Sequence, residues 1–353
     1  MVNYLKFLTD LGVDALLLLN ESNMHYFCKF SPSEGVVFLT KDGVGYHIVD
    51  SRYTEVAEEN AKITGLNVIE IKTKFSDELL RLCQKHGINT LGFEDETISY
   101  RAFNNYKTAL SCEFKPIGNY LTEVRNVKTD EEILLLKKAN EIAEKSFLEL
   151  LNHIKAGKTE KELQAYFDYT MAKNGSDGLS FDTILLTGAH TSLPHGVPSD
   201  RKIKKGDFVL VDFGATYKGY HSDMTRTVAV GSATSEMREM YYLVLKAQLA
   251  GINALKAGAP CAEVYKSAYD VLEEKTMGKY FRHSLGHGVG LDIHEGYNSS
   301  PRSTDVYKVN NVTSVEPDIY IPNKFGIRIE DVCIVKEDGC ENISTVNKEL
   351  IVL

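Results

Sequence analysis

The sequence has no apolar run of the length that a membrane span needs. A transmembrane helix takes about 20 consecutive apolar residues. The apolar run within the N-terminal segment MVNYLKFLTDLGVDALLLLN is short, and Asp10 and Asp14 interrupt it. No small-residue cleavage site follows, so the segment does not have the pattern of a secretory signal. We therefore expect no membrane partner and a cytoplasmic location.

The sequence also lacks an excess of basic residues. Its 353 residues include 40 Lys and Arg against 49 Asp and Glu, a formal net charge of -9 at pH 7. Binding to nucleic acid or to an anionic membrane favours a basic face, so this balance argues against both partners. Part of the acidic excess is available for a cluster that a bound cation would neutralise.

A paired-cysteine motif is the third absence. The six cysteines are scattered and none forms a C-x-x-C pair. In a chain of this length, such spacing is typical of reduced thiols in a cytosolic protein.

The length predicts two domains, at roughly 100–200 residues each. Residues 1 to about 120 alternate short strand and helix patterns, so we predict an α/β domain over 1–121, a linker near Tyr120–Lys128 and a second domain over 122–353. The predicted elements of the first domain are strands at Ala15–Leu19, Gly35–Thr40, Gly45–Val49 and Val68–Ile71 and an amphipathic helix at Phe75–His86.

A short repeat organises the second domain. Ile154-Lys-Ala-Gly157 recurs as Leu255-Lys-Ala-Gly258, at an offset of 101 residues. A long helix is expected before each copy, at Thr129–Ile154 and at Ser235–Ala257. Thr129 and Glu132 have the spacing of a capping box, and Gly157 is expected to end the first helix.

A strand-rich hairpin follows each copy, at Phe208–Val230 and at Val312–Val335. The matching order of elements predicts a duplicated helix–helix–hairpin unit. We expect the two hairpins to form one sheet, with the helices covering it.

Each hairpin carries two carboxylates. A turn centred between Tyr217 and Lys218 would place Asp212 opposite Asp223. Residues opposed in this way have Cβ atoms about 4.5–5.5 Å apart, where two like charges destabilise a sheet unless something positive lies between them.

The second hairpin repeats the arrangement. A turn centred on Asn323 would place Glu316 opposite Glu330. Four inward-facing carboxylates cannot stay ionised without cations. Oxygen ligands suit Mn²⁺ or Mg²⁺, and one imidazole widens the choice to Co²⁺, Fe²⁺ or Zn²⁺.

An imidazole is expected from the segment His283–His294, which contains His283, His287 and His294. Glycines around His287 let the backbone approach a site closely. They also weaken a helix, so this is not a helical H-E-x-x-H zinc motif. The residues alone leave open which of these histidines binds a metal.

These segments resemble the pita-bread metallopeptidases, the family of Xaa-Pro aminopeptidases, prolidases and methionine aminopeptidases. The resemblance covers essentially the whole chain. It implies an α/β (α+β) fold, with a creatinase-like N-terminal domain followed by a duplicated pita-bread catalytic domain. The matching blocks are Phe181-Asp-Thr-Ile, Leu193-Pro-His-Gly196, Asp212-Phe-Gly-Ala, Tyr220-His-Ser-Asp-Met-Thr-Arg226, His283-Ser-Leu-Gly-His-Gly-Val-Gly290, Glu316-Pro317 and Arg328-Ile-Glu-Asp331.

The resemblance implies two divalent ions per subunit, with Mn²⁺ expected and Co²⁺, Zn²⁺ or Fe²⁺ as alternatives. Asp223, His287 and Glu316 would bind one ion, and Asp212 and Glu330 would bridge both. A homodimer is also implied.

Three segments separate the branches of this family. Asn23–Phe30, Asp50-Ser-Arg-Tyr53 and Val124-Arg-Asn-Val-Lys-Thr-Asp-Glu-Glu132 look like the Xaa-Pro branch. That branch implies hydrolysis of the bond between an N-terminal residue and proline in peptides or dipeptides, by attack of a metal-bridging hydroxide. A methionine aminopeptidase is the alternative within the same chemistry. A non-catalytic peptide-binding relative on the same fold is the alternative that lacks this chemistry.

Roles follow for several residues of these blocks. We expect Glu316 to shuttle the proton and Arg328 to orient Glu330. His195 and His294 are expected to donate to the carbonyl oxygen as it gains charge. The remaining assignment is His283, which is expected to bound the leaving-group pocket or to have a structural role.

Three positions depart from the family pattern or carry no fixed role. Asp318 stands where a glycine is usual, and His221 stands where a small residue or cysteine is usual. We interpret His221 as structural or as supporting a ligand. Arg302 follows the histidine block and is a candidate for holding a dipeptide's carboxylate.

Overall fold

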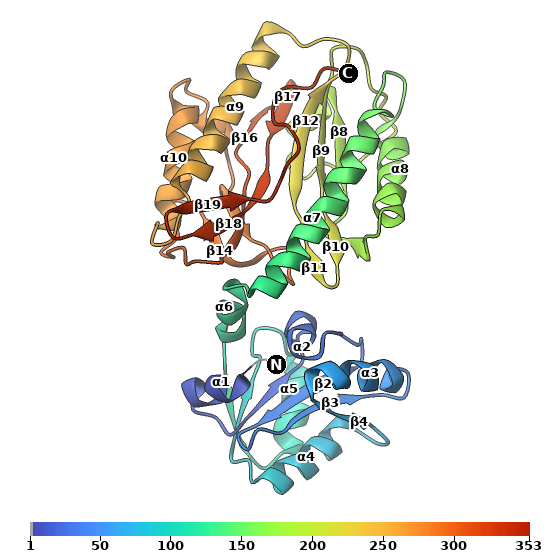
Figure 1. Cartoon of the computed structure of the whole chain (residues 1–353), viewed down its shortest axis with the longest axis vertical. Coiled ribbons are helices and arrows are strands. Elements are labelled where there is room, and N and C mark those ends of the chain that lie inside the picture. The colour runs from blue at the N-terminus through green and yellow to red at the C-terminus, as the bar shows by residue number, and fades with distance from the viewer. Residues whose placement is uncertain (1–2) are drawn as a thin grey trace. The chain divides into compact units, whose positions relative to one another are not determined.

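The computed structural model describes residues 3–353 (Figure 1) and divides them into two compact units. The first unit runs to Val124 and the second comprises Arg125–Leu353. No helix within residues 3–353 is both long enough and apolar enough to span a membrane.

The first unit is a six-stranded sheet in the order β4-β3-β2-β1-β5-β6 with helices around it. Its central strand β1 is the apolar run Ala-Leu-Leu-Leu, and all four residues are buried, as expected of a strand covered on both faces. The strands are β1 Ala15–Leu18, β2 Gly35–Thr40, β3 Gly45–Val49, β4 Asn67–Glu70, β5 Thr90–Phe93 and β6 Glu113–Pro116. The helices are α1 Tyr4–Leu11, α2 Glu21–Cys28, α3 Thr54–Thr64, α4 Phe75–His86 and α5 Tyr100–Ala109. The predicted strands and the helix at Phe75–His86 are confirmed to within one residue.

The predicted linker is wrong in one respect, because it is helical. Helix α6 spans Tyr120–Asn126, and α7 follows at Asp130–Leu151. The capping box of Thr129 and Glu132 is confirmed, but α7 ends at Leu151, before the predicted Gly157. Gly157 lies instead in the loop after the helix, at φ 94.

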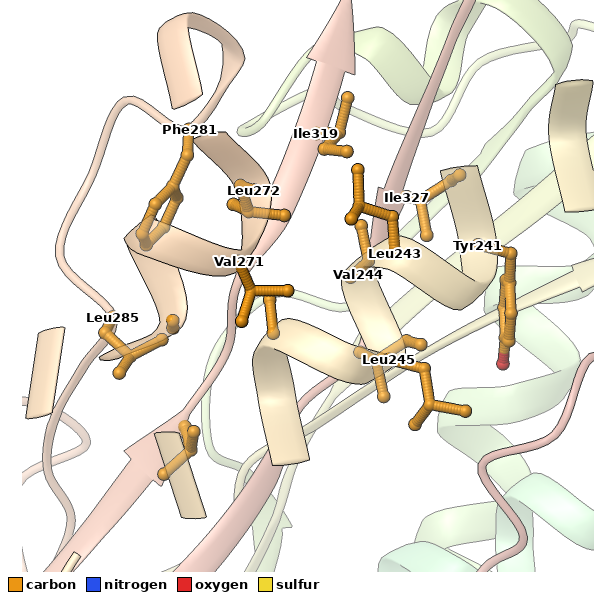
Figure 2. Packing of buried hydrophobic residues seen from close by; sticks show 14 of the residues in the cluster. Tyr241, Leu243, Val244, Leu245, Val271, Leu272, Phe281, Leu285, Ile319 and Ile327 are labelled. Carbon is orange, nitrogen blue, oxygen red and sulfur yellow. The ribbon is translucent and has the colours of Figure 1, made fainter. Parts of the chain in front are cut away.

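The second unit pairs two helices with each half of the duplication. Figure 1 shows α7 and α8 along one side of its strands, and α9 and α10 along the other. The additional helices are α8 Glu160–Lys173, α9 Ser235–Ala254 and α10 Cys261–Glu273, with short 3-10 turns at Gly188–Ser192 and Gly278–Tyr280. Figure 2 shows α9 and α10 packing through Val244 and Leu272 towards Ile319 and Ile327, in one buried core.

The backbone confirms the duplication. Gly157 N donates to Ile203 O at 2.9 Å, and Gly258 N donates to Tyr307 O at 2.8 Å. The return bonds also correspond, since Ile203 N reaches Lys158 O and Tyr307 N reaches Ala259 O. The four-residue repeat therefore marks the same loop in both halves.

The strands of the second unit form several short sheets rather than the single sheet that we expected. They are β7 Gly178–Leu179, β8 Ile184–Thr187, β9 Phe208–Phe213, β10 Ala215–Tyr217, β11 Tyr220–His221, β12 Met224–Ala229, β13 Gly286–Gly288, β14 Glu295–Ser299, β15 Val312–Val315, β16 Asp318–Ile321, β17 Phe325–Arg328, β18 Asp331–Lys336 and β19 Gly339–Asn342. The halves meet where Glu330 N donates to Thr225 O at 3.1 Å.

The predicted register of the first hairpin is wrong by two residues. Asp212 pairs with Thr225, because the turn is at Lys218-Gly219, both with positive φ. Such a turn suits a two-residue hairpin. Since side chains alternate along a strand, a shift of two keeps Asp223 on the face of Asp212 as its diagonal neighbour.

The register of the second hairpin agrees with the prediction. Val315 pairs with Asp331 and Asp318 pairs with Arg328. Glu316 and Glu330 lie between these pairs, at the position where the same register opposes them.

Candidate metal centre and active-site cavity

Asp212 and Asp223 come from the first half of the second unit. Asp212 lies in β9, every residue of which is buried, and Asp223 directly precedes β12. Both carboxylates are buried. The apolar strands therefore carry two charged groups into the interior, where water cannot compensate them.

Glu316 and Glu330 come from the second half. Ser314 Oγ donates to Glu316 Oε1 at 3.1 Å, and Thr225 Oγ1 donates to Glu330 Oε2 at 2.6 Å. The Thr225 contact joins the halves, because this residue belongs to the strand that pairs with Asp212.

His287 brings the imidazole to these carboxylates. Its Nε2 lies 3.5 Å from Asp223 Oδ2 and 3.4 Å from Glu316 Oε1. Its Nδ1 lies 3.1 Å from Gly288 O, to which it can donate. A proton on Nδ1 leaves the lone pair of Nε2 directed towards the carboxylates, which is the tautomer that binds a metal.

The resulting cluster fits a divalent cation. One ligand atom each from Asp223, His287 and Glu330 lies within 4.8 Å of the others. Burial and neighbouring carboxylates raise the pKa values of Asp223 and Glu330 well above their ordinary range. Asp212 Oδ1 is buried and accepts no hydrogen bond from residues 3–353. These are the features of a donor set that a cation completes.

Arg328 contacts a different carboxylate from the one predicted. Its Nη2 binds the Asp212 carboxylate and its Nη1 binds the Tyr320 hydroxyl. Its Nε donates to Thr225 Oγ1 at 3.0 Å, and that hydroxyl in turn donates to Glu330. Arg328 thus orients Asp212 directly and Glu330 only through Thr225. A single guanidinium cannot neutralise four carboxylates.

The cluster opens onto a cavity of about 840 Å³. The lining includes Asp212, Asp223, Glu316, Glu330, His287, Arg328, His195, His283 and His294, together with apolar residues such as Phe181, Ile184 and Ile293. The structure brings together every predicted site residue except Arg302. Arg302 is exposed and does not belong to the described lining, so the structure gives no support to its proposed role.

His195 and His294 are exposed on the cavity wall. The ring of His294 lies 4.2 Å, centroid to centroid, from that of His287. Burial and the neighbouring His287 lower the pKa of His294. A neutral imidazole at this position can still donate one hydrogen bond into the cavity.

Asp318 is a site residue whose contact the sequence did not predict. It is fully buried, and its carboxylate contacts Nε2 of His283. Nδ1 of His283 lies 2.7 Å from Ser284 O. Burial opposes a charge on His283, but Asp318 outweighs it and raises the pKa of His283 to about 9. The only sign of this contact in the sequence was that Asp318 stands where the family usually has a glycine.

Glu160 was also missed, and it holds the loop that carries His195. This buried carboxylate accepts from Thr187 N at 2.7 Å and from Ser199 N at 2.9 Å, at the two ends of the loop. His190 Nδ1 lies 2.9 Å from it as well. In the sequence Glu160 looks like an ordinary first-turn acid of a helix, so no pattern distinguishes it.

His221 has the supporting position that we expected. Its backbone N and its Nδ1 both lie near Gly290 O, at 3.0 and 3.1 Å. It therefore holds the glycine-rich segment after His287 and does not line the cavity described above.

The fold and the site together define a metal-dependent hydrolase built on a duplicated unit. The profile of Metallopeptidase family M24 matches residues 135–337, and that of the Creatinase/Prolidase N-terminal domain matches residues 3–127. The chain therefore belongs to metallopeptidase family M24.

Several related proteins are similar to this chain over nearly its whole length. An Xaa-Pro dipeptidase from Pyrococcus furiosus is 37% identical, over 98% of this chain and 97% of the relative. The structure of an Xaa-Pro dipeptidase from Bacillus anthracis is 40% identical, with a TM-score of 0.95, over 99% of this chain and 98% of that one. The structure of an X-Pro aminopeptidase from Thermotoga maritima MSB8 is 38% identical, with a TM-score of 0.93, over 98% and 99%.

Proposed function

We propose that this chain is an Xaa-Pro peptidase, which hydrolyses the bond between an N-terminal residue and proline. The observation that carries the proposal is the convergence of four carboxylates and His287 on one cavity. Relatives over the full length are named Xaa-Pro dipeptidase and X-Pro aminopeptidase. The match to a Creatinase/Prolidase N-terminal domain favours this branch over a methionine aminopeptidase.

The metal ligands that we propose are Asp212, Asp223, His287, Glu316 and Glu330. Mn²⁺ is the expected ion at two sites per subunit, with Co²⁺, Zn²⁺ or Fe²⁺ as alternatives. When bound, such ions lower the pKa of a water molecule towards neutrality and polarise a carbonyl group.

Glu316 is the proposed proton carrier. Burial raises its pKa, and the carboxylate of Asp212 adds to this while His283 and Arg328 oppose it. A carboxylate beside the attacking water can accept its proton and return it to a leaving group. Glu316 would take the proton of the attacking water and pass it to the leaving nitrogen.

His195 and His294 are the proposed donors to the scissile carbonyl oxygen. Both imidazoles are exposed on the cavity wall, so they can reach a bound substrate. Donors placed where negative charge develops stabilise the transition state. His283 would bound the leaving-group side, fixed there by Asp318 and Ser284.

The reaction suits a proline leaving group. Its nitrogen has no hydrogen in the peptide, so cleavage does not depend on an N–H donor and does depend on a positioned acid. The apolar side chains of Phe181, Ile184 and Ile293 in the lining provide surface for a pyrrolidine ring.

The test measures release of the N-terminal residue by metal-depleted protein to which Mn²⁺ is returned. The substrates are a Lys-Pro dipeptide, an Arg-Pro-Pro peptide and a Met-Ala peptide, with Glu316→Gln as the inactive control. We expect turnover of a proline substrate, and the dipeptide-to-tripeptide ratio then gives the length preference. Turnover of Met-Ala alone would assign a methionine aminopeptidase. Mn²⁺ binding without any turnover would assign a binding protein and overturn the proposal.

We further propose a homodimer located in the cytoplasm. Analytical ultracentrifugation of the purified chain tests the dimer, and a single species at the monomer mass would overturn it. Fractionation of the native cells tests the location.

A further inference from the structure

A cluster of buried charges lies beneath the loop that carries His294. Arg125 and Lys128 are 3% and 2% exposed, and Glu295 is 4% exposed. Lys128 Nζ lies 2.7 Å from Glu295 Oε1, and Arg125 Nη2 lies 3.4 Å from Glu295 Oε2. Lysine and arginine are almost never fully buried unless they are paired, so two of them on one glutamate need an explanation.

The same cluster also contacts Asp292, on the other side of His294. Arg125 Nη2 lies 2.5 Å from Asp292 Oδ2. Asp292 N donates to Glu295 Oε2 at 3.3 Å. Asp292 and Glu295, which flank His294 in the sequence, thus belong to one network of charges.

Two glycines show how closely the cluster approaches this loop. A Cβ on Gly290 would lie 2.0 Å from Glu295 Oε1. A Cβ on Gly296, whose φ is +68, would lie 1.9 Å from Asn126 Oδ1. A side chain at Gly290 would have to displace the Glu295 carboxylate, and one at Gly296 would displace Asn126 and also strain the backbone.

His294 is the group that this arrangement presents to the cavity. Its ring is exposed and lies against His287, so its place depends on the backbone that carries it. A donor to a developing oxyanion must lie within a few tenths of an ångström of its correct position. His294 and Gly296 are exposed, so the contacts of their neighbours Asp292 and Glu295 must supply this rigidity.

We propose that Arg125 and Lys128 are positioning residues that act on catalysis through Glu295 and the placement of His294. This inference rests on the proposed function, in which His294 donates to the substrate carbonyl. Arg125 and Lys128 touch neither the substrate cavity nor the metal ligands. Their effect on the reaction should therefore disappear when the imidazole of His294 is removed.

A double-mutant cycle tests this dependence. Lys128→Met keeps most of the side-chain volume and removes the charge. We expect it to lower kcat for the preferred Xaa-Pro substrate about tenfold, with little change in KM, because the misplaced donor stabilises the transition state less. In a His294→Ala background, the same change should lower kcat less than about twofold. An equal loss in both backgrounds would overturn the proposal.

The matched control is Lys137→Met. Lys137 forms an ion pair with Glu341 but is 38% exposed, and its loss should leave kcat unchanged. The variant Lys128→Met/Glu295→Gln removes both charges of the pair, so it serves if Lys128→Met does not fold. It should show the same dependence on His294.

A second readout needs neither metal nor substrate. Hydrogen exchange of the peptide spanning 289–297 should quicken in metal-free Lys128→Met while other segments keep the wild-type rate. Unchanged exchange in this peptide would overturn the proposal. Failure of the proposed function is distinguishable, because the wild type would then turn over no Xaa-Pro substrate whatever the exchange shows.

Discussion

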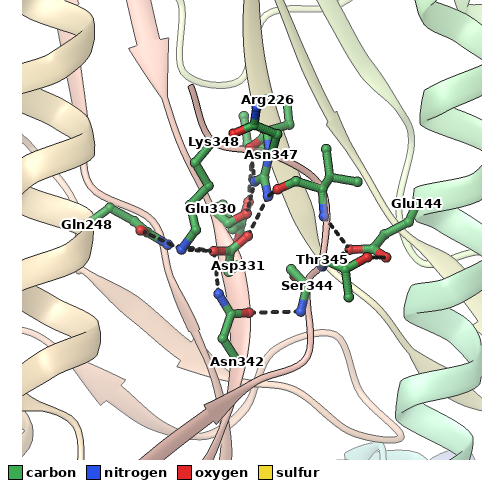
Figure 3. Close-up of polar contacts among 12 residues, drawn as sticks. Glu144, Arg226, Gln248, Glu330, Asp331, Asn342, Ser344, Thr345, Asn347 and Lys348 are labelled. Atoms are coloured by element: carbon green, nitrogen blue, oxygen red, sulfur yellow. Dashed lines mark hydrogen bonds and ion pairs between the residues drawn. The ribbon is translucent and has the colours of Figure 1, made fainter. Parts of the chain in front are cut away.

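Arg226 Nη2 lies 2.7 Å from Asp331 Oδ1, and both side chains are fully buried between the two halves of the catalytic unit. Figure 3 shows the pair within a network that includes Gln248, Asn342 and Lys348. Arg226 Nη1 also donates to Glu330 O at 2.6 Å. Arg226 thus fixes the backbone of Glu330, a proposed metal ligand that belongs to the other half of the duplication.

Removal of Asp331 should destabilise the protein strongly. Asp331→Ala leaves Arg226 and Lys348 as buried or half-buried charges without their shared partner. We expect a loss of about 3–5 kcal/mol in the free energy of unfolding, measured by circular dichroism in urea. Asp270→Ala, which removes an exposed ion pair with Lys266, should cost less than about 0.5 kcal/mol. If both variants lost a similar amount of unfolding free energy, burial would not explain the importance of the Arg226–Asp331 pair.

Neutralising Asp223, a proposed metal ligand, should have opposite effects with and without metal. The pKa of Asp223 is raised by burial and by Asp212 and Glu316, so its charge destabilises the metal-free protein at pH 7. Asp223→Asn should therefore raise the free energy of unfolding in EDTA.

The same variant should lose most of the stabilisation that Mn²⁺ gives the wild type, about 2.7 kcal/mol at a hundredfold excess over Kd. Calorimetry in EDTA and in Mn²⁺ measures both effects. Full Mn²⁺ stabilisation of Asp223→Asn would exclude this residue as a ligand.

Gly286 should be intolerant of a side chain. A Cβ at this position would lie 1.9 Å from the backbone oxygen of Ser314. Gly286→Ala must therefore move β13, which carries His287, away from β15. We expect at least a tenfold loss of Mn²⁺ affinity, or loss of folded protein. Gly339→Ala, where nothing lies within 4 Å of the added Cβ, should bind Mn²⁺ like the wild type.

His47 should make the stability of the first unit depend on pH. Burial lowers the pKa of His47 to about 4, from an ordinary value near 6.5. The unfolded state then binds more protons between these values. The contribution of His47 to the free energy of unfolding is therefore complete above about pH 6.5. It falls by about 1.4 kcal/mol for each pH unit from there towards pH 4.

His47→Gln should therefore lose less stability than the wild type when the pH falls from 7 to 5. Urea unfolding at the two pH values measures the difference. The exposed His153→Gln serves as control and should follow the wild type. Identical pH dependence in His47→Gln and the wild type would show that His47 does not carry the effect.

Local features were predictable because their physics is local. The capping box of Thr129 and Glu132 needs only neighbouring backbone, and the helix starts where it was predicted. The candidate metal ligands could be chosen from the sequence because strand parity, which alternates with every residue, sets the face of each side chain. The predicted turn was one residue away from the observed turn at Lys218-Gly219, but the register error was two residues, so the parity of Asp212 and Asp223 was preserved.

Contacts between distant segments depended on the tertiary structure. Arg328 binds Asp212 across 116 residues, Lys128 binds Glu295, and Asp318 binds His283. No periodicity or spacing encodes these pairs, because they arise where separate elements bury charges against one another. The same reason applies to Arg302, which does not belong to the described cavity lining because the path of its loop, and not its place in the sequence, decides what it contacts. The residues by themselves thus determined four candidate carboxylate ligands, because strand parity sets their face, but left open which histidine joins them. The packing of the two halves decided which residues hold the proposed ligands and His283 in place.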